Sequence, residues 1–304
     1  MCSHLYAVSG SGKTRLCLEG LCHQWGFYIS CRGTSKKRVA GSMDFVTATQ
    51  MMTEMSSWDE CIEKTDDVVN PVKTNVARRA FEMLICARLF VLKHLLEKLP
   101  PGTDAKTARR RWVLIQAMPP SIRYPSDIFS IVLESLRCAN SRDMADLIKS
   151  MLADMTKIIG ESIFPLNQQF FAVIDEAQVA AEYMNESFRS LTTGIDARPV
   201  LHPFYRFLQD ADFIKGTILA GTGLSMKMMK KAVNSRGAQL LEESRNPLIF
   251  YDVGLFSNPG TDHRAYLEKY LTFASTVPDS RLMQRILYWF SGRWVSSWHR
   301  ETER

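Results

Sequence analysis

The sequence predicts an α/β fold in which helices cover both faces of a parallel sheet. Five short apolar runs have the length and the β-forming residues of buried strands, at 4–8, 26–31, 169–174, 215–220 and 248–253. The segments between most of them are long enough for crossover helices. Buried strands that alternate with helices are typical of a parallel sheet whose two faces are both covered.

Helical periodicity fills most of the chain between the second and the third predicted strand. Apolar residues from Ala77 to Leu99 form one stripe, while Asn70 and Pro71 supply a cap and a first-turn proline and Pro100 ends the segment. This pattern predicts a helix over 73–99. Further helices are expected over 15–25, 104–118, 127–139, 144–159 and 282–290.

The composition is that of an ordinary globular protein. Of 304 residues, 46% are hydrophobic and 23% are charged, close to the average of folded domains. No run approaches the roughly 20 apolar residues that a bilayer span needs, and the first residues lack the apolar stretch of a signal peptide. We therefore expect an intracellular protein, cytoplasmic or nuclear, with no membrane anchor. The seven cysteines form no CxxC pair and the six histidines are scattered, which argues against a disulfide framework and a transition-metal site.

A phosphate-binding loop follows the first predicted strand. Residues 7–14, AVSGSGKT, fit the eight-residue pattern, with Ala7 where glycine is usual. Gly10 and Gly12 allow backbone N–H groups to converge on an anion at the start of a helix. Lys13 is expected to reach the β- and γ-phosphates, and the Thr14 hydroxyl to bind Mg²⁺. The residues predicted to bind the nucleotide are Ser9, Gly10, Ser11, Gly12, Lys13 and Thr14.

Two acidic residues end the strand predicted at 169–174. Five apolar residues precede Asp175 and Glu176, as in a Walker B motif. Asp175 is expected to hold the magnesium ion together with Thr14, and Glu176 to activate the attacking water. A phosphate loop combined with this acidic strand predicts a P-loop NTPase fold of the ASCE type, with ATP or another nucleotide and magnesium as its ligands.

Two further catalytic residues are expected beyond the acidic pair. Thr222 follows the strand at 215–220, where a polar residue senses the γ-phosphate in ATPases with a catalytic glutamate. A transition-state arginine is also expected, and Arg293 is favoured because it follows the predicted C-terminal helix. The other candidates are Arg198, Arg206, Arg236 and Arg245.

The spacing of the motifs indicates a single P-loop NTPase domain over 1–304. The first strand has little lead-in and the last segment is a polar tail, so both ends are expected to be trimmed. Thr14 and Asp175 lie 161 residues apart, more than a minimal nucleotide-binding core needs. A helical insertion is therefore expected over 50–165, and a C-terminal helix and tail over 280–304.

The positive charge is concentrated in the first half of the chain. The net charge is +6, and its densest runs are at 36–38 and 109–111. These runs predict either a surface that binds nucleic acid or protein through the insertion, or ordinary solvated faces. The insertion itself is either a recognition element or a passive lid. An oligomer is compatible with the sequence, and no membrane partner is expected.

With these motifs, the chain resembles the P-loop NTPase module of Crinkler-type proteins of fungi and oomycetes, a group related to STAND ATPases and to retrotransposon-hot-spot proteins of trypanosomes. The resemblance covers nearly the whole chain, and it implies nucleotide-binding or catalytic roles for Lys13, Thr14, Asp175 and Glu176. It depends on SGSGKTRLCLEGL (9–21), WGFYIS (25–30), GSMD (41–44), RRRWVLIQAMPP with the following DIF (109–129), FAVIDEAQVA (171–180), RPVLHPFYRFLQ (198–209), KGTILAGTGLSMK (215–227) and SGRW (291–294).

Two functions of different classes agree with these observations. The first is an Mg²⁺-dependent ATPase whose turnover drives a conformational or assembly switch, and Glu176 favours it. The alternative is a nucleotide-loaded interaction module with weak hydrolysis, which Ala7 and the short first strand favour. The DEAQ string at 175–178 is also typical of helicases, but the second RecA-like half that a helicase needs is not seen in this sequence.

Overall fold

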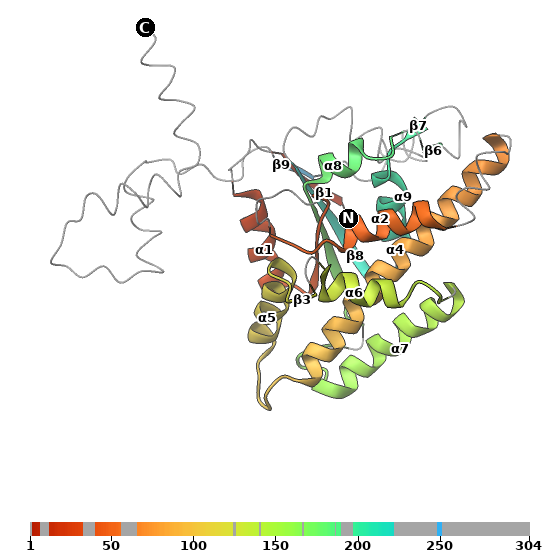
Figure 1. Cartoon of the computed structure of the whole chain (residues 1–304). Coiled ribbons are helices and arrows are strands. Elements are labelled where there is room, and N and C mark those ends of the chain that lie inside the picture. The colour runs from red at the N-terminus through yellow and green to blue at the C-terminus, as the bar shows by residue number, and fades with distance from the viewer. Residues whose placement is uncertain are drawn as a thin grey trace, which may run out of the picture.

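The computed structural model describes most of the first 221 residues. The described ranges are 2–6, 12–32, 40–55, 66–123, 126–139, 141–165, 167–185, 187–189, 197–221 and 248–250. The predicted α/β class is confirmed: helices flank a five-stranded, wholly parallel sheet (Figure 1).

The strands of the sheet do not follow one another in chain order. Across the sheet the order is β2–β5–β8–β1–β9. Their bounds are β1 Cys2–Tyr6, β2 Gly26–Ser30, β5 Phe170–Asp175, β8 Ile214–Gly221 and β9 Leu248–Phe250. The strand before the phosphate loop is therefore separated from the strand that ends in Asp175 by β8 alone.

The helices and two small hairpins occupy the connections. The helices are α1 Lys13–His23, α2 Asp44–Glu54, α4 Asp66–Glu97, α5 Ala105–Ala117, α6 Ile128–Ser135, α7 Ser141–Ile159, α8 Ala177–Glu182 and α9 Leu201–Asp210. The hairpins pair β3 Ser121–Arg123 with β4 Ser126–Asp127, and β6 Phe188–Arg189 with β7 Ala197–Arg198. The predicted helix over 282–290 lies outside the described residues.

The start of the longest helix differs from the prediction. The helix α4 begins at Asp66, so Pro71 lies inside it and not in its first turn. A proline there removes one backbone donor and disfavours the helix locally. The buried stripe that begins at Val76 packs α4 against α2, α6, α7 and α9, and this packing outweighs the local preference.

Alternate side chains of the strands enter two separate cores, because successive residues of a strand point to opposite faces. On one face, Tyr28 and Val173 pack with Cys17 and Leu21 of α1. On the other face, Phe27 and Phe170 stack at 4.8 Å and belong to the larger core formed with α2, α4 and α9.

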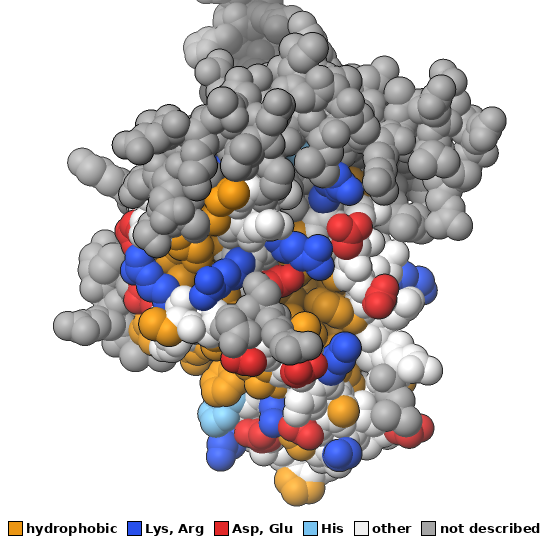
Figure 2. All heavy atoms as spheres, turned by 90° about the vertical axis from the view of Figure 1, so that its right-hand side faces the viewer, with side chains coloured by type: hydrophobic (Ala, Val, Ile, Leu, Met, Phe, Trp, Pro, Cys, Tyr) orange, Lys and Arg blue, Asp and Glu red, His pale blue; other side chains and the backbone are white. Residues whose placement is uncertain are grey.

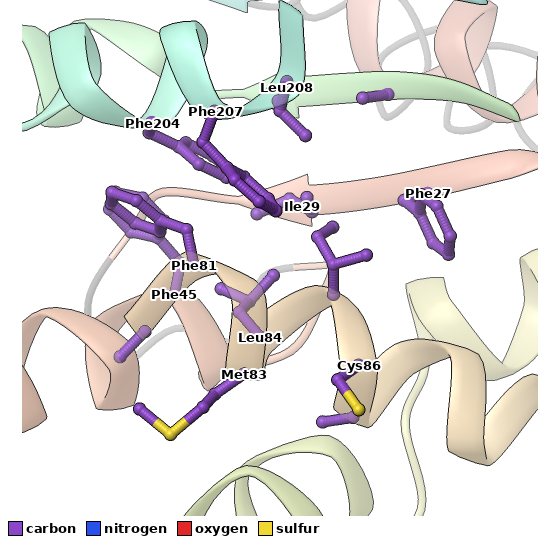
Figure 3. Packing of buried hydrophobic residues seen from close by; sticks show 14 of the residues in the cluster. Phe27, Ile29, Phe45, Phe81, Met83, Leu84, Cys86, Phe204, Phe207 and Leu208 are labelled. Atoms are coloured by element: carbon purple, nitrogen blue, oxygen red, sulfur yellow. The ribbon is translucent and has the colours of Figure 1, made fainter. Parts of the chain in front are cut away.

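An aromatic cluster joins three helices of the larger core. The rings of Phe45, Phe81 and Phe204 come from α2, α4 and α9, with centroid separations of 4.4–6.2 Å. Figure 3 shows these rings facing one another next to Ile29 of β2. The segment predicted as an insertion, 50–165, therefore supplies one of the layers that cover the sheet.

Candidate functional site

The two sequence motifs meet at the carboxyl end of the sheet. The Thr14 hydroxyl donates a hydrogen bond to Oδ2 of Asp175 at 2.6 Å, across 161 residues of chain. The register explains this contact: Tyr6, the last residue of β1, lies opposite Gly221, while Asp175 ends β5 on the other side of β8. Carboxyl ends of parallel strands share one edge, so the ends of β1 and β5 lie about 10 Å apart.

Gly12 forms the start of α1 in the conformation that the motif requires. It is the N-cap, with φ 84° and ψ 12°, in the left-handed region. A Cβ built there would meet no atom within 4 Å, so the backbone conformation, and not lack of space, demands glycine. The next residue, Lys13, opens the helix with its side chain only 6% exposed. Ser9, Gly10 and Ser11 lie outside the described residues.

Asp175 is buried, at 3% exposure, and both its oxygens accept hydrogen bonds. Oδ1 accepts from the backbone N–H of Glu176 at 2.9 Å. Oδ2 accepts from Thr14 and also from the Tyr28 hydroxyl, at 2.7 Å. Its orientation is therefore set by three neutral donors.

Tyr28 and Cys17 remain protonated beside this carboxylate. Burial, and then the negative charge of Asp175, raises the pKa of Tyr28 far above its ordinary value. The same two causes raise the pKa of Cys17 to about 12, against a smaller opposite effect of Lys13. Neither group ionises near neutral pH, so Tyr28 acts as a hydrogen-bond donor to Asp175 and Cys17 is no nucleophile.

Glu176 adopts a backbone conformation that is rare for a residue with a side chain. Its φ of 54° and ψ of 37° are left-handed, and it forms the N-cap of α8. Its Oε2 accepts a hydrogen bond from the Gln178 amide, and its Oε1 lies 3.8 Å from Nη1 of Arg32. The carboxylate predicted to activate water is thus held by two side chains from the same end of the sheet.

Close packing accounts for the glycine at the end of β8. A Cβ at Gly221 would overlap Oε1 of Gln178, so a larger residue would displace the end of the side chain that donates to Glu176. Thr222, which comes directly after Gly221, lies outside the described residues, as do Arg236, Arg245 and Arg293.

The remaining arginine candidates lie elsewhere. Arg198 is in β7 and is 8% exposed. Arg206 is on α9 and borders a hollow of about 160 Å³. The hollow is lined by Thr74, Asn75, Arg78, Phe188, His202, Pro203, Arg206, Phe207 and Asp210. None of these residues belongs to the phosphate-loop or acidic motifs.

The described basic run, 109–111, lies on α5. Arg109 donates to the carbonyl of Cys22 at 3.3 Å, while Arg110 and Arg111 are exposed. Burial raises the pKa of the Cys22 thiol, and the charges of Arg110 and Arg109 both act to lower it against this larger effect. Figure 2 shows another face of the molecule, on which the described Lys and Arg side chains alternate with Asp and Glu. The run at 36–38 lies outside the described residues.

The site has the oxygen donors that a hard cation prefers. Mg²⁺ usually binds one or two protein oxygens and completes its shell with water and phosphate. Thr14 and Asp175 fit this requirement, with Lys13 next to them. Within the described part of the chain, no group of three or more His, Cys, Asp or Glu residues is placed to hold a metal.

Sequence reasoning missed three residues of this site: Tyr28, Arg32 and Gln178. Only Gln178 had a local signal, because it lies within the DEAQ string.

Comparisons of the chain with protein-family models, curated proteins and solved structures find no match. Among the helices in the described ranges, none is long and apolar enough to cross a bilayer.

Proposed function

We propose that this chain is an Mg²⁺-dependent P-loop NTPase that binds ATP or another nucleoside triphosphate at the start of α1. The observation that carries the proposal is the 2.6 Å hydrogen bond between Thr14 and Asp175. Two motifs that are far apart in the sequence meet at the point where a phosphate loop and a Walker B aspartate need to meet.

The strand order also supports this class. One strand, β8, lies between the strand before the loop and the strand that ends in Asp175. A strand inserted at this place distinguishes the ASCE division of P-loop NTPases, whose members carry a glutamate after the Walker B aspartate. Glu176 occupies that position.

Each residue has a role that follows from its chemistry. The N-terminus of α1 and the ammonium of Lys13 bind the phosphates, because both carry positive charge. Thr14 and Asp175 hold magnesium, which when bound neutralises phosphate charge. Glu176 orients a water and accepts its proton. Ser9, Gly10 and Ser11 complete the phosphate cradle, and Thr222 and Arg293 remain proposed partners of the γ-phosphate.

A second function is favoured by the state of Glu176. Its carboxylate is engaged by Gln178 and Arg32, and one of these contacts has to be released before Glu176 can accept a proton from water. The alternative is therefore a nucleotide-loaded interaction module with weak hydrolysis, which binds a nucleic acid or protein partner.

In the first function, the Mg²⁺-dependent NTPase, turnover drives a conformational or assembly switch of the Crinkler-like kind, inside the cell.

Nucleotide binding and turnover of three variants test this proposal. Lys13→Ala is expected to weaken ATP binding at least tenfold, because the phosphates lose their nearest cation. Glu176→Gln is expected to retain binding and to lower turnover roughly 10²–10⁴-fold. Lys93→Ala is the matched control, since Lys93 pairs with Asp154 at 2.8 Å in the helical layer.

The outcomes separate the two functions. Wild-type turnover no greater than that of Glu176→Gln, with ATP still bound, selects the interaction module. ATP affinity of Lys13→Ala within threefold of wild type rejects nucleotide binding at this loop.

A further inference from the structure

Tyr28, in the middle of β2, belongs to neither motif although it is part of the site. Its hydroxyl donates to the same Asp175 oxygen that accepts from Thr14, at 2.7 and 2.6 Å. The side chain is 1% exposed, so this hydrogen bond forms inside the protein. Charged acceptors in such surroundings form stronger hydrogen bonds than neutral ones.

Side chains of two helices hold the backbone of Tyr28 by hydrogen bonds. The strand β2 is at the edge of the sheet, where backbone groups lack a neighbouring strand. Here the Tyr28 N–H donates to Oε1 of Gln116 at 2.8 Å, and the Tyr28 carbonyl accepts from Nη1 of Arg88 at 2.7 Å. Gln116 and Trp112 also donate to the carbonyl of Gly26, at 3.2 and 2.8 Å. Side chains of α4 and α5 thus take the place of a further strand.

Arg88 is itself fixed by an ion pair. Its Nε and Nη2 donate to the two oxygens of Asp44 at 2.6 and 2.9 Å, and both side chains are 0% exposed. The guanidinium also lies 4.9 Å from the centre of the Phe129 ring. A continuous set of contacts therefore runs from Asp44 through Arg88 and Tyr28 to Asp175.

We propose that Tyr28 is a positioning residue, which holds the Asp175 carboxylate in the orientation that binds magnesium with the nucleotide. The inference rests on the proposed function. It gives the helices between the two motifs a role in constructing the site, because Arg88 and Gln116 hold Tyr28 in place. A passive lid would have no such contacts.

The test is a magnesium titration of nucleotide binding, with a fluorescent ATP analogue as the probe. Tyr28→Phe removes the hydroxyl and keeps the ring. We expect it to raise the magnesium concentration at half-maximal binding about tenfold, the effect of one hydrogen bond to a charged group. Affinity measured without magnesium is expected to stay within twofold of wild type.

Tyr205→Phe is the matched control. Tyr205 lies on α9 and is only 7% exposed, so the variant also removes the phenol hydroxyl of a buried residue. We expect its magnesium dependence to equal that of wild type. An equal effect of the two substitutions would show a general loss of packing and would overturn the proposal.

A second variant decides the matter if Tyr28→Phe does not fold. Gln116→Leu removes the amide that holds the Tyr28 backbone, and we expect it to raise the same magnesium midpoint about threefold. An unchanged midpoint in the folded variant, or an equal loss with and without magnesium, overturns the inference. Failure of wild type to bind the analogue at all rejects the proposed function instead.

Discussion

Asp44 and Asp175 are both buried and are both linked to Tyr28, but their partners differ in kind. Asp44 forms a bidentate ion pair with Arg88, and neither side chain is exposed. Asp175 accepts hydrogen bonds from the hydroxyls of Thr14 and Tyr28 and from one backbone N–H. The charge of the first aspartate is matched by a cation of the protein, whereas the partners that orient the second are neutral. Under the proposed function, this difference separates an aspartate that stabilises the fold from one that is available to a bound cation.

The same substitution, Asp to Asn, is expected to reduce stability much more at Asp44 than at Asp175. Asp44→Asn leaves the Arg88 guanidinium buried without its counter-charge, so we expect a loss of about 3–5 kcal/mol in the free energy of unfolding. Urea denaturation measures this loss. The control is Glu19→Gln, which breaks the exposed Arg15–Glu19 pair and should cost less than about 1 kcal/mol. Equal losses in the two variants would contradict the structural role of Asp44.

A third aspartate tests whether neutral donors alone identify the site. Within the described ranges the hydrogen-bond donors to Asp127 are also neutral, and they belong to Ser42, Met43, Phe129 and Ser130. It caps α6, where the helix N-terminus compensates its charge. Asp127→Ala should cost about 2 kcal/mol without any change in the magnesium dependence of nucleotide binding.

The control for this variant is the exposed cap of α5. Asp104 accepts from the N–H groups of Lys106 and Thr107 but has no partner from the 40–44 segment among its hydrogen bonds in the structure. Asp104→Ala should therefore reduce the melting temperature less than Asp127→Ala. A larger effect at Asp104 would mean that the bonds to Ser42 and Met43 contribute nothing.

Asp175→Asn should change stability little. The Thr14 and Tyr28 hydroxyls can both accept from the new amide in place of donating to the carboxylate, and no ion pair with Asp175 is broken among the described residues, so we expect a loss of about 1 kcal/mol. A loss in urea denaturation as large as that of Asp44→Asn would show that both aspartates serve the fold.

Of the three buried thiols in the described residues, Cys17, Cys31 and Cys86, the first and the last provide the finest comparison. Burial raises the pKa of Cys86 from 9.0 to about 12, and burial together with the charge of Asp175 does the same for Cys17. Above pH 9 the unfolded chain loses these protons while the folded chain keeps them, so stability falls as the pH rises from 9 toward 12.

Replacement of each thiol by alanine measures its share of this fall. The limit is about 1.4 kcal/mol per pH unit for one thiol. In an Asp175→Asn background, the contribution of Cys17 to the slope between pH 9 and pH 10.5 should decrease, and that of Cys86 should not. An unchanged contribution of Cys17 to the slope would mean that the charge of Asp175 does not raise the pKa of the thiol.

The sequence predicted the parts of the fold that depend on local pattern. The five strands, the glycine at position 12 and the pairing of Thr14 with Asp175 follow from short motifs and from alternation of strands and helices. The predicted start of α4 was wrong, because the packing of α4 from Val76 onward outweighs the preference of Pro71 for the first turn of a helix. Tyr28 could not be found, since an aromatic residue in an apolar strand looks like any core residue. Its role depends on the register that places Tyr28 opposite Val173 of β5, two residues before Asp175.

If the charge of Asp175 acts on a magnesium–nucleotide complex, its removal changes nucleotide affinity only when Mg²⁺ is present. Wild type and Asp175→Asn are titrated with ATP by calorimetry with and without Mg²⁺. We expect the variant to lose at least tenfold in affinity with magnesium and to stay within twofold of wild type without it. An equal loss in the two conditions, or no loss in either, would show that Asp175 does not act through magnesium.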